Sequence, residues 1–276
     1  MSEVRPRVKS VSNQQSGNTT HARAVDSVRF LGVATVVTVL AAWYIVTVVM
    51  PLIPSLFFPS PPDVLRALVE LRYSIIQHSL VTLYRVLTSF SVGSMIGILI
   101  GLLMSRSRIV YAILDPVIEA LRPVPPIALI PFFILWFGIG NFGKVLLSGL
   151  GCFMVLVVNT VVAVRNVPPI YVRAAASLGA DPRTIYRTVV VPAIVPSLVS
   201  GWRVAAALAF ALTVAAELMG AQSGLGFLVM VARRSLQTDV ILLSVIILSI
   251  EAWFVDRAIR VLSNRVTPWM ERLESK

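Results

Sequence analysis

Long apolar runs dominate this chain and decide what it can fold into. A helix needs about 20 apolar residues to cross a hydrocarbon core about 30 Å thick. Six spans are predicted, at residues 31–50, 80–104, 127–139, 145–164, 198–219 and 240–262. The third run is short; it can extend backward through Pro123, Pro125 and Pro126, and these prolines are expected to bend the chain. Overall, 57% of the residues are hydrophobic and 13% are charged, which is outside the range of soluble domains. The sequence therefore predicts an all-α polytopic membrane protein with about six transmembrane helices.

The polar segments between and beside these runs give the expected domain organisation. Residues 29–264 are expected to form one transmembrane domain, which includes a polar loop at residues 165–195. Residues 1–28 contain few apolar side chains and are expected to be a disordered tail, with a second short tail at residues 265–276. The first apolar run lies too far from the start for a cleavable signal peptide, so we expect it to remain as an anchor.

The net charge of +11 raises the question of nucleic-acid binding, which the distribution of the basic residues answers. Most of the 24 Lys and Arg residues fall in the N-terminal segment, the C-terminal segment and two of the predicted loops, which all lie on one side of the six-span topology. Basic residues accumulate on the cytoplasmic side of membrane proteins. Both termini and the polar loop are therefore expected in the cytoplasm, and no nucleic-acid partner is expected.

No catalytic site or metal site is predicted from the sequence. The single cysteine, Cys152, excludes an internal disulfide and a thiol-rich metal site. Neither His21 nor His78 has a Cys, Asp or Ser at a spacing typical of a triad or a ligand set. We expect a protein that is not an enzyme and that binds no cofactor itself.

The segment Gly138-Ile-Gly-Asn-Phe-Gly-Lys144 has the spacing of a phosphate-binding loop, but its context argues against that function. Val145 stands where such a loop has the Ser or Thr that binds Mg²⁺. The predicted topology also places the segment on the non-cytoplasmic side, where ATP is absent. We interpret the segment as a tight turn between two spans, so any energy from ATP must come from a separate polypeptide.

The polar loop contains residues that favour two short helices joined at an elbow. Gly179 can adopt the left-handed conformation that ends a helix. Asp181 and Pro182 suit the N-cap and the first position of the helix that follows. Three successive alanines before the elbow would leave a slim helix surface that fits closely into the groove of another protein.

The same loop resembles the EAA loop of permeases from bacterial ABC importers. That pattern has Glu-Ala-Ala, three residues, Gly, nine residues, two spaced aliphatic residues and Pro; here Ala174, Ala175, Gly179 and Pro192 occupy the matching positions. Arg173 replaces the leading Glu; it either caps the helix and meets solvent or pairs with an acidic residue of the ATPase. The resemblance implies that Arg173, Ala174, Ala175, Gly179, Asp181 and Pro192 couple the chain to an ATPase.

Further segments are similar to permeases for taurine, other sulfonates and nitrate. They include residues 121–131 with their four prolines, the Gly224-Leu-Gly-Phe227 segment, and Thr267-Pro-Trp269. The resemblance implies a type I ABC importer permease in the bacterial inner membrane, working as a homodimer. Its implied partners are two ATPase subunits, which carry ATP and Mg, and an extracytoplasmic solute-binding protein. The implied cargo is a small anion, taurine or another sulfonate, with nitrate, bicarbonate or another small solute as the alternative.

Arg85, Arg203 and Glu217 are ionisable residues within the predicted spans, where each costs about 2.5–3.5 kcal/mol on insertion scales. Arg85 and Glu217 lie near the outer ends of their spans, and Arg203 lies near a cytoplasmic end. Glu217 either forms a structural ion pair, with Arg85, Arg233 or Arg234 as candidates, or belongs to the gate or translocation path. Arg85 can instead extend its guanidinium to the outer interface, and Arg203 can bond an acidic residue or carbonyls of the loop region.

Small residues recur every four positions on the second span, at Gly93, Gly97 and Gly101. This spacing places them on one helix face, which allows another helix backbone to approach closely. We expect close helix packing there.

A secondary carrier driven by an ion gradient is the alternative from a different class. It would be favoured by inverted internal repeats and by paired acidic residues at mid-membrane. Neither feature was recognised in the sequence.

Overall fold

The computed structural model describes residues 31–32, 34–50 and 53–266. These residues form helices and no strands, which confirms the all-α prediction. The tail predicted at residues 1–28 lies outside the described residues, as does the predicted tail at 265–276 apart from its first two residues.

The chain divides into two compact units, Met1–Asp63 and Val64–Lys276. The described part of the first unit contains an apolar helix, Ala34–Val49, whose last turn is the π-helix η2 (Ile45–Val49). Within this unit the Trp43 indole N–H donates a 3.0 Å hydrogen bond to the Pro59 carbonyl oxygen. The first predicted span falls on this helix, which is shorter than the four long helices of the second unit.

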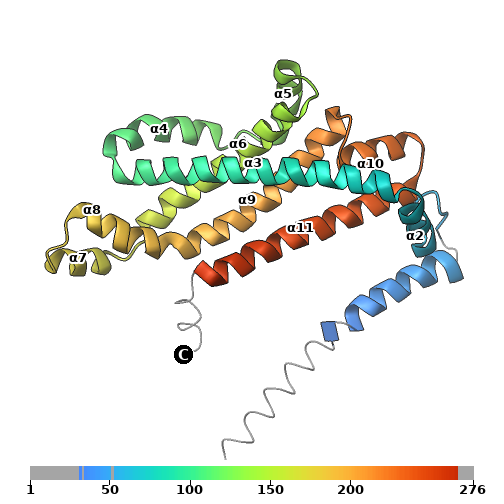
Figure 1. Ribbon diagram of the computed structural model, residues 1–276, viewed down its shortest axis with the longest axis horizontal. Helices are drawn as coiled ribbons and strands as arrows, with labels where there is room; N and C mark the ends of the chain where they lie inside the picture. The colour runs from blue at the N-terminus through green and yellow to red at the C-terminus, as the bar shows by residue number, and fades with distance from the viewer. Residues whose placement is uncertain (1–30, 33, 51–52, 267–276) are drawn as a thin grey trace, which may run out of the picture. The chain divides into compact units, whose positions relative to one another are not determined.

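Four long helices form the framework of the second unit (Figure 1). They are α3 (Arg72–Arg106), α6 (Asn141–Arg165), α9 (Val191–Gly220) and α11 (Thr238–Val266). Among the described residues, four helices are long and apolar enough to cross a membrane, or five if one bent pair counts as a span. The first predicted span corresponds to the shorter apolar helix Ala34–Val49, which is not among these four or five.

The predicted third span differs most from the structure. Residues 127–139 form η3 (Pro126–Leu129) and the short α5 (Ile130–Phe137), and the helix α4 (Arg108–Leu121) meets this segment at an angle of 83°. Pro123, Pro125 and Pro126 explain the break, because proline lacks an N–H and disfavours a helical residue before it. The apolar run is thus one half of a bent pair.

The three glycines of α3 lie directly against α6. A Cβ added to Gly97 would lie 2.8 Å from the Phe153 carbonyl oxygen, and one added to Gly101 would lie 2.6 Å from Cβ of Thr160. A Cβ on Gly93 would collide with the Gly149 carbonyl oxygen. Because no larger residue fits, the two helix backbones approach as closely as the spacing predicts.

Helix α6 also packs against α9, so it lies between α3 and α9 in the core of the second unit. The buried core residues come from all three helices: Val86, Cys152, Leu156, Ala205, Ala209 and Phe210. The remaining elements are α2 (Pro61–Glu70), α7 (Pro169–Ser177), α8 (Pro182–Ile185), η4 (Tyr186–Val190) and α10 (Leu225–Arg234). Figure 1 shows α7 and α8 at one end of the second unit and α10 at the other.

Candidate functional site

The end of α7 has the geometry predicted for the elbow. Gly179 has φ +82°, and its N–H donates to the Ala176 carbonyl oxygen at 2.9 Å. The Ala180 N–H donates to the Ala175 carbonyl oxygen at 3.2 Å. Together these two bonds form a Schellman motif, which satisfies carbonyls that the helix end would leave free.

Asp181 begins α8 as its N-cap residue. Its Oδ2 accepts hydrogen bonds from the backbone N–H groups of Arg183 at 3.0 Å and Thr184 at 3.3 Å, and its Oδ1 accepts one from the Thr184 hydroxyl. These bonds, led by that of the Thr184 hydroxyl, hold the pKa of the Asp181 carboxyl below its ordinary value. Pro182 occupies the first turn, where its missing N–H has no cost.

The elbow presents apolar side chains outward. Ile170, Tyr171 and Leu178 are 58%, 55% and 88% exposed. Ala174 is exposed and Ala175 is partly buried, so the alanines line the same short helix as these larger side chains. An apolar surface of this kind on a polar loop is typical of a protein contact.

Arg173 does not cap the start of α7. The helix begins at Pro169, so Arg173 occupies its second turn and its side chain is exposed. The electrostatic field of a helix terminus falls off within the first turn. Of the two alternatives for Arg173, the cap at the helix start therefore does not fit the structure, because Pro168 and Pro169 begin the helix earlier.

The elbow continues into α9 without a break. The π-helix η4 follows α8 directly, and Pro192 lies in the first turn of α9. The Tyr186 hydroxyl of η4 donates a 2.9 Å hydrogen bond to the Leu102 carbonyl oxygen of α3. The loop is therefore attached to the helical core as well as to α9.

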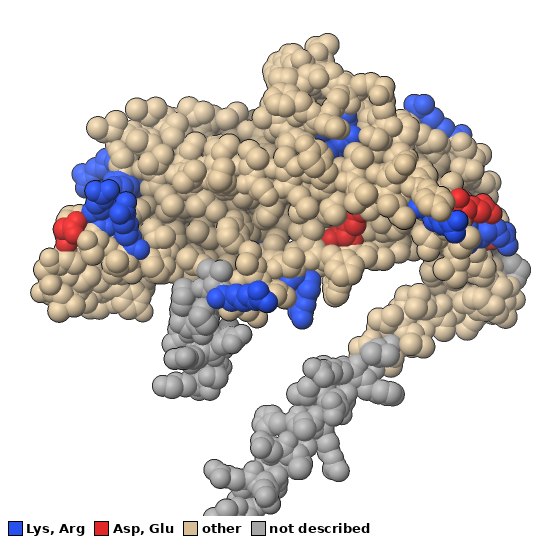
Figure 2. All heavy atoms as spheres, in the orientation of Figure 1, with Lys and Arg blue, Asp and Glu red and all other residues tan. Residues whose placement is uncertain are grey.

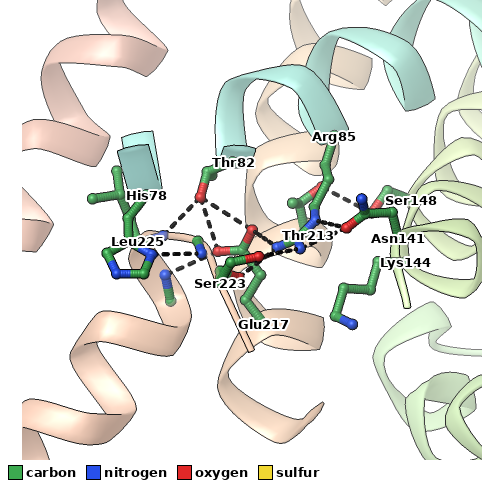
Figure 3. Close-up of polar contacts among 12 residues, drawn as sticks. His78, Thr82, Arg85, Asn141, Lys144, Ser148, Thr213, Glu217, Ser223 and Leu225 are labelled. Carbon is green, nitrogen blue, oxygen red and sulfur yellow. Dashed lines mark hydrogen bonds and ion pairs between the residues drawn. The ribbon is translucent and has the colours of Figure 1, made fainter. Parts of the chain in front are cut away.

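A buried polar network lies at the opposite end of α9, where Arg85 and Glu217 face each other (Figure 3). Arg85 Nη1 lies 2.6 Å from Glu217 Oε1, and the two side chains are 2% and 0% exposed. Three arginines were candidate ion-pair partners of Glu217, and Arg85 is the one that pairs with it. The pairing places opposite charges from α3 and α9 in direct contact.

Every N–H of the Arg85 guanidinium has an acceptor. Its Nε and Nη2 donate to Asn141 Oδ1 at 2.9 and 2.7 Å. Besides the bond to Glu217, Nη1 donates to the Ser223 carbonyl oxygen at 2.7 Å, and Nη2 donates to Ser223 Oγ at 3.0 Å. Arg85 thus joins α6, α9 and the loop that leads to α10.

The Glu217 carboxylate is bonded as completely as its partner. The Thr82 hydroxyl donates to its oxygens at 3.0 Å, and the Gly226 N–H donates to Oε2 at 2.9 Å. A Cβ on Gly224, whose φ is +111°, would collide with this carboxylate. Glycine is therefore required where the α9–α10 loop closes over the acid.

Arg203 takes no part in this network. Its Nε lies 2.7 Å from Asp256 Oδ1 on α11, and Asp256 also pairs with Arg260 at 2.7 Å. The Arg203 side chain is 42% exposed. The expected acidic partner exists, but it belongs to the last helix rather than to the polar loop.

Lys144 is bound within its own turn. It is 3% exposed, and its Nζ donates to the Gly140 carbonyl oxygen at 2.9 Å and to the Ile139 carbonyl oxygen. Its amine is therefore bound to the turn at residues 138–140 between α5 and α6, while the rest of the predicted turn, residues 141–144, is the start of α6.

Several residues of the network were not singled out from the sequence. Thr82, Asn141 and Ser223 lie far from one another in the chain and carry no recognisable spacing.

A further buried acid, Glu251 on α11, is 8% exposed. Its Oε1 accepts from the Ser79 hydroxyl, and its Oε2 has no partner among the described residues. Glu251 could have been recognised from the sequence, because it is an acidic residue within an apolar run. The described residues show no group of three or more His, Cys, Asp or Glu side chains suited to a metal.

Comparisons with known proteins agree with this architecture. The chain is 35% identical to the taurine transport system permease protein TauC of Escherichia coli over 87% of its own length and 89% of that protein. It is 30% identical to a putative aliphatic sulfonates transport permease protein, SsuC of Bacillus subtilis, over 86% of each chain. A solved structure of the MetNI methionine ABC transporter in an inward-facing conformation shares the fold, with a TM-score of 0.57 and 21% identity over 70% of this chain and 97% of the other.

The match to a defined family covers the elbow, the glycine face of α3 from Gly93 onward and Glu217. Residues 93–268 match the family described as the binding-protein-dependent transport system inner membrane component. The chain therefore belongs to this family of membrane-spanning permeases of ABC transporters.

Proposed function

We propose that this permease moves a small organic anion, taurine or another sulfonate, into the cell. Support for the cargo comes from the relatives, whose names refer to taurine and aliphatic sulfonates and which align over most of the chain. Nitrate, bicarbonate and other small solutes are the alternatives within the same class of importer.

The exposed elbow is the observation that carries the proposal of ATP coupling. Leu178, 88% exposed, and the neighbouring Ile170 and Tyr171 form an apolar surface beside the left-handed Gly179. A groove on a separate ATPase subunit would cover this surface and would push on α7 and α8. The ATPase would hold the ATP and Mg, while this chain supplies the path.

The proposed orientation places the elbow in the cytoplasm and the Arg85–Glu217 network toward the outer side. The distribution of Lys and Arg along the sequence supports it through the positive-inside rule. One chain offers one elbow, so two copies of the chain would engage two ATPases. A solute-binding protein would deliver the cargo at the outer end.

The Arg85–Glu217 network is proposed to hold the outer gate closed. An unpaired carboxylate about 4 Å from an anion would repel it by on the order of 4 kcal/mol at an effective dielectric near 20. The ion pair and the bonds from Thr82 and Gly226 remove that free charge. In the half of α9 nearer the elbow, Arg203 would hold α9 against α11 through its ion pair with Asp256.

Uptake in reconstituted vesicles tests the proposed function. The permease, its ATPase and its binding protein are reconstituted with ATP inside, and the entry of labelled taurine is measured with and without a protonophore. Uptake that needs ATP and the binding protein, and that persists with the protonophore, is expected. Uptake that proceeds without ATP, and that the protonophore abolishes, would instead indicate a secondary carrier. Competition by unlabelled nitrate and bicarbonate separates the alternative cargoes.

A further inference from the structure

The outer end of α9 and the last turns of α10 line an open pocket of about 450 Å³. Leu218, Met219, Met230, Arg233 and Arg234 line it. The volume is within the range of about 300–1,000 Å³ that is usual for small-molecule sites. The pocket therefore has room for a small organic solute.

The two arginines of this pocket have no charged partner within the described part of the chain. Glu217, for which both arginines were candidate partners, is bonded to Arg85 instead. Both side chains are exposed in the last turn of α10, and Figure 2 shows basic side chains gathered where this helix ends. The pocket thus presents two guanidinium groups that are available to an anion.

The turn after α10 fixes the position of these arginines. Leu236 has φ +55°, a conformation that is uncommon for a residue other than glycine. Its N–H donates to the Arg233 carbonyl oxygen at 3.3 Å, and the Gln237 N–H donates to the Ala232 carbonyl oxygen at 2.9 Å. Backbone hydrogen bonds therefore hold the end of the helix that carries both arginines.

The chemistry of the lining matches an anion that has a hydrocarbon part. A guanidinium presents a planar set of donors that suits the oxygens of an oxyanion, and it remains charged at every physiological pH. Leu218, Met219 and Met230 supply an apolar wall beside it, and methionine adapts its shape to varied ligands. Inorganic anions such as nitrate would use only the guanidinium part.

The pocket is also connected directly to the Arg85–Glu217 network. Leu218 and Met219 follow Glu217 in α9, and the first turn of α10 contains Gly226, whose N–H donates to Glu217. A ligand that bridges the pocket walls would therefore press on the two helices that the network joins.

From these observations we propose that Leu218, Met219, Met230, Arg233 and Arg234 form the outer receiving site for the sulfonate. The two arginines bind the sulfonate oxygens, and the apolar wall contacts the carbon chain. This inference rests on the proposed function, because it assigns the site at which the proposed cargo leaves the binding protein.

Uptake by the complete reconstituted complex tests the receiving site. The double substitution Arg233→Gln/Arg234→Gln is expected to lower taurine uptake at saturating binding protein at least tenfold. Arg233→Lys/Arg234→Lys keeps both charges at the helix end but loses the planar donor set, so only partial recovery is expected. Leu218→Trp, which fills the pocket and leaves both arginines, is expected to reduce uptake as well. Arg72→Gln, at an exposed arginine of α3 outside the pocket, is the matched control and should retain wild-type uptake.

A second measurement separates the receiving site from other roles of the arginines. The affinity of the taurine-loaded binding protein for the permease complex should stay within about twofold of wild type in the Gln variant. A large loss of this affinity would show that the arginines contact the binding protein, and full recovery with Lys would show a purely electrostatic role; either result overturns the proposal. Normal uptake by the Gln variant would also overturn it, whereas absence of taurine uptake by the wild-type complex would overturn the proposed function itself.

Discussion

Arg85 and Glu217 lie 132 positions apart in the chain, yet their side chains meet at 2.6 Å between Nη1 and Oε1. Both are buried, so removing one partner leaves the other charge without compensation, at a cost of about 3–5 kcal/mol. Glu217→Gln is expected to lower transport and to loosen coupling, so that ATP is hydrolysed without delivery of cargo. Arg85→Gln should produce the same defect, and the double variant should add little to either.

The ratio of ATP hydrolysed to solute delivered measures this effect. Arg203→Gln is the control, because its pair with Asp256 is partly exposed and worth about 0.2–1 kcal/mol. Additive losses from Glu217 and Arg85 would show that the two residues act independently.

Gly179→Val is expected to abolish ATP-driven uptake while the protein still inserts into the membrane. Nothing lies within 4 Å of a Cβ at this position, so the defect comes from the backbone conformation alone. A left-handed residue with a side chain costs about 1–2 kcal/mol or more. Gly140→Val is the matched control, since it also has open space but has φ −67°. Equal uptake by the two variants would contradict a role for the elbow geometry.

Arg173→Glu tests whether the ATPase contacts this exposed side chain. If Arg173 pairs with an acidic residue of the ATPase, charge reversal should weaken the complex, and an acidic-to-basic change on the ATPase should restore it. Co-purification of the two subunits measures this. Because Arg173 lies in the second turn of α7, the substitution should change the stability of the helix little. If no change on the ATPase restores assembly, the pairing is absent.

Gly97→Ala is expected to destabilise the packing of α3 against α6 by about 1–3 kcal/mol, as in other overpacked interiors. The added Cβ would lie 2.8 Å from a backbone oxygen of α6, which cannot easily move aside. Gly149→Ala, from the other side of the same interface, meets its nearest atom at 3.5 Å and should be tolerated. Thermal unfolding in detergent compares the two variants.

Asp181→Ala should speed hydrogen exchange at the Arg183 and Thr184 amides, because both lose their acceptor. The pKa of Asp181 is lowered in the folded protein, so its contribution to folded-state stability is complete above the ordinary aspartate pKa of about 3.9. This stabilisation is lost as the pH falls through the lower pKa of the folded state. After correction for intrinsic exchange, protection in the wild type should be constant from about pH 5 to 8. A loss of protection within that range would contradict the assignment.

The elbow was predictable because its determinants are local. Gly179, Asp181 and Pro182 each act on backbone groups within a few residues, and the sequence displays them side by side. The close packing of α3 could also be anticipated, since a repeat of four places Gly93, Gly97 and Gly101 on one face.

The network around Arg85 could be predicted only in part. Two buried residues of opposite charge suggested a pair, but Asn141 and Ser223 lie 56 and 138 positions from Arg85. Contacts at such separations depend on how the helices pack, which local patterns do not specify. The prolines of the third run did indicate a bend, but α4 was not recognised as the other half of the bent pair, because it mixes apolar residues with Arg, Asp and Glu.

The unbroken helical run from Pro182 to Gly220 has a mechanical consequence. It is 39 residues long, which corresponds to about 58 Å at a rise of 1.5 Å per residue. One end follows the elbow, and the other carries Glu217 three residues before the run ends. If an ATPase pushes on the elbow as proposed, the push would travel along this run as along a lever arm to the ion pair, and the π-helix Tyr186–Val190 and Pro196 are places where the arm can bend.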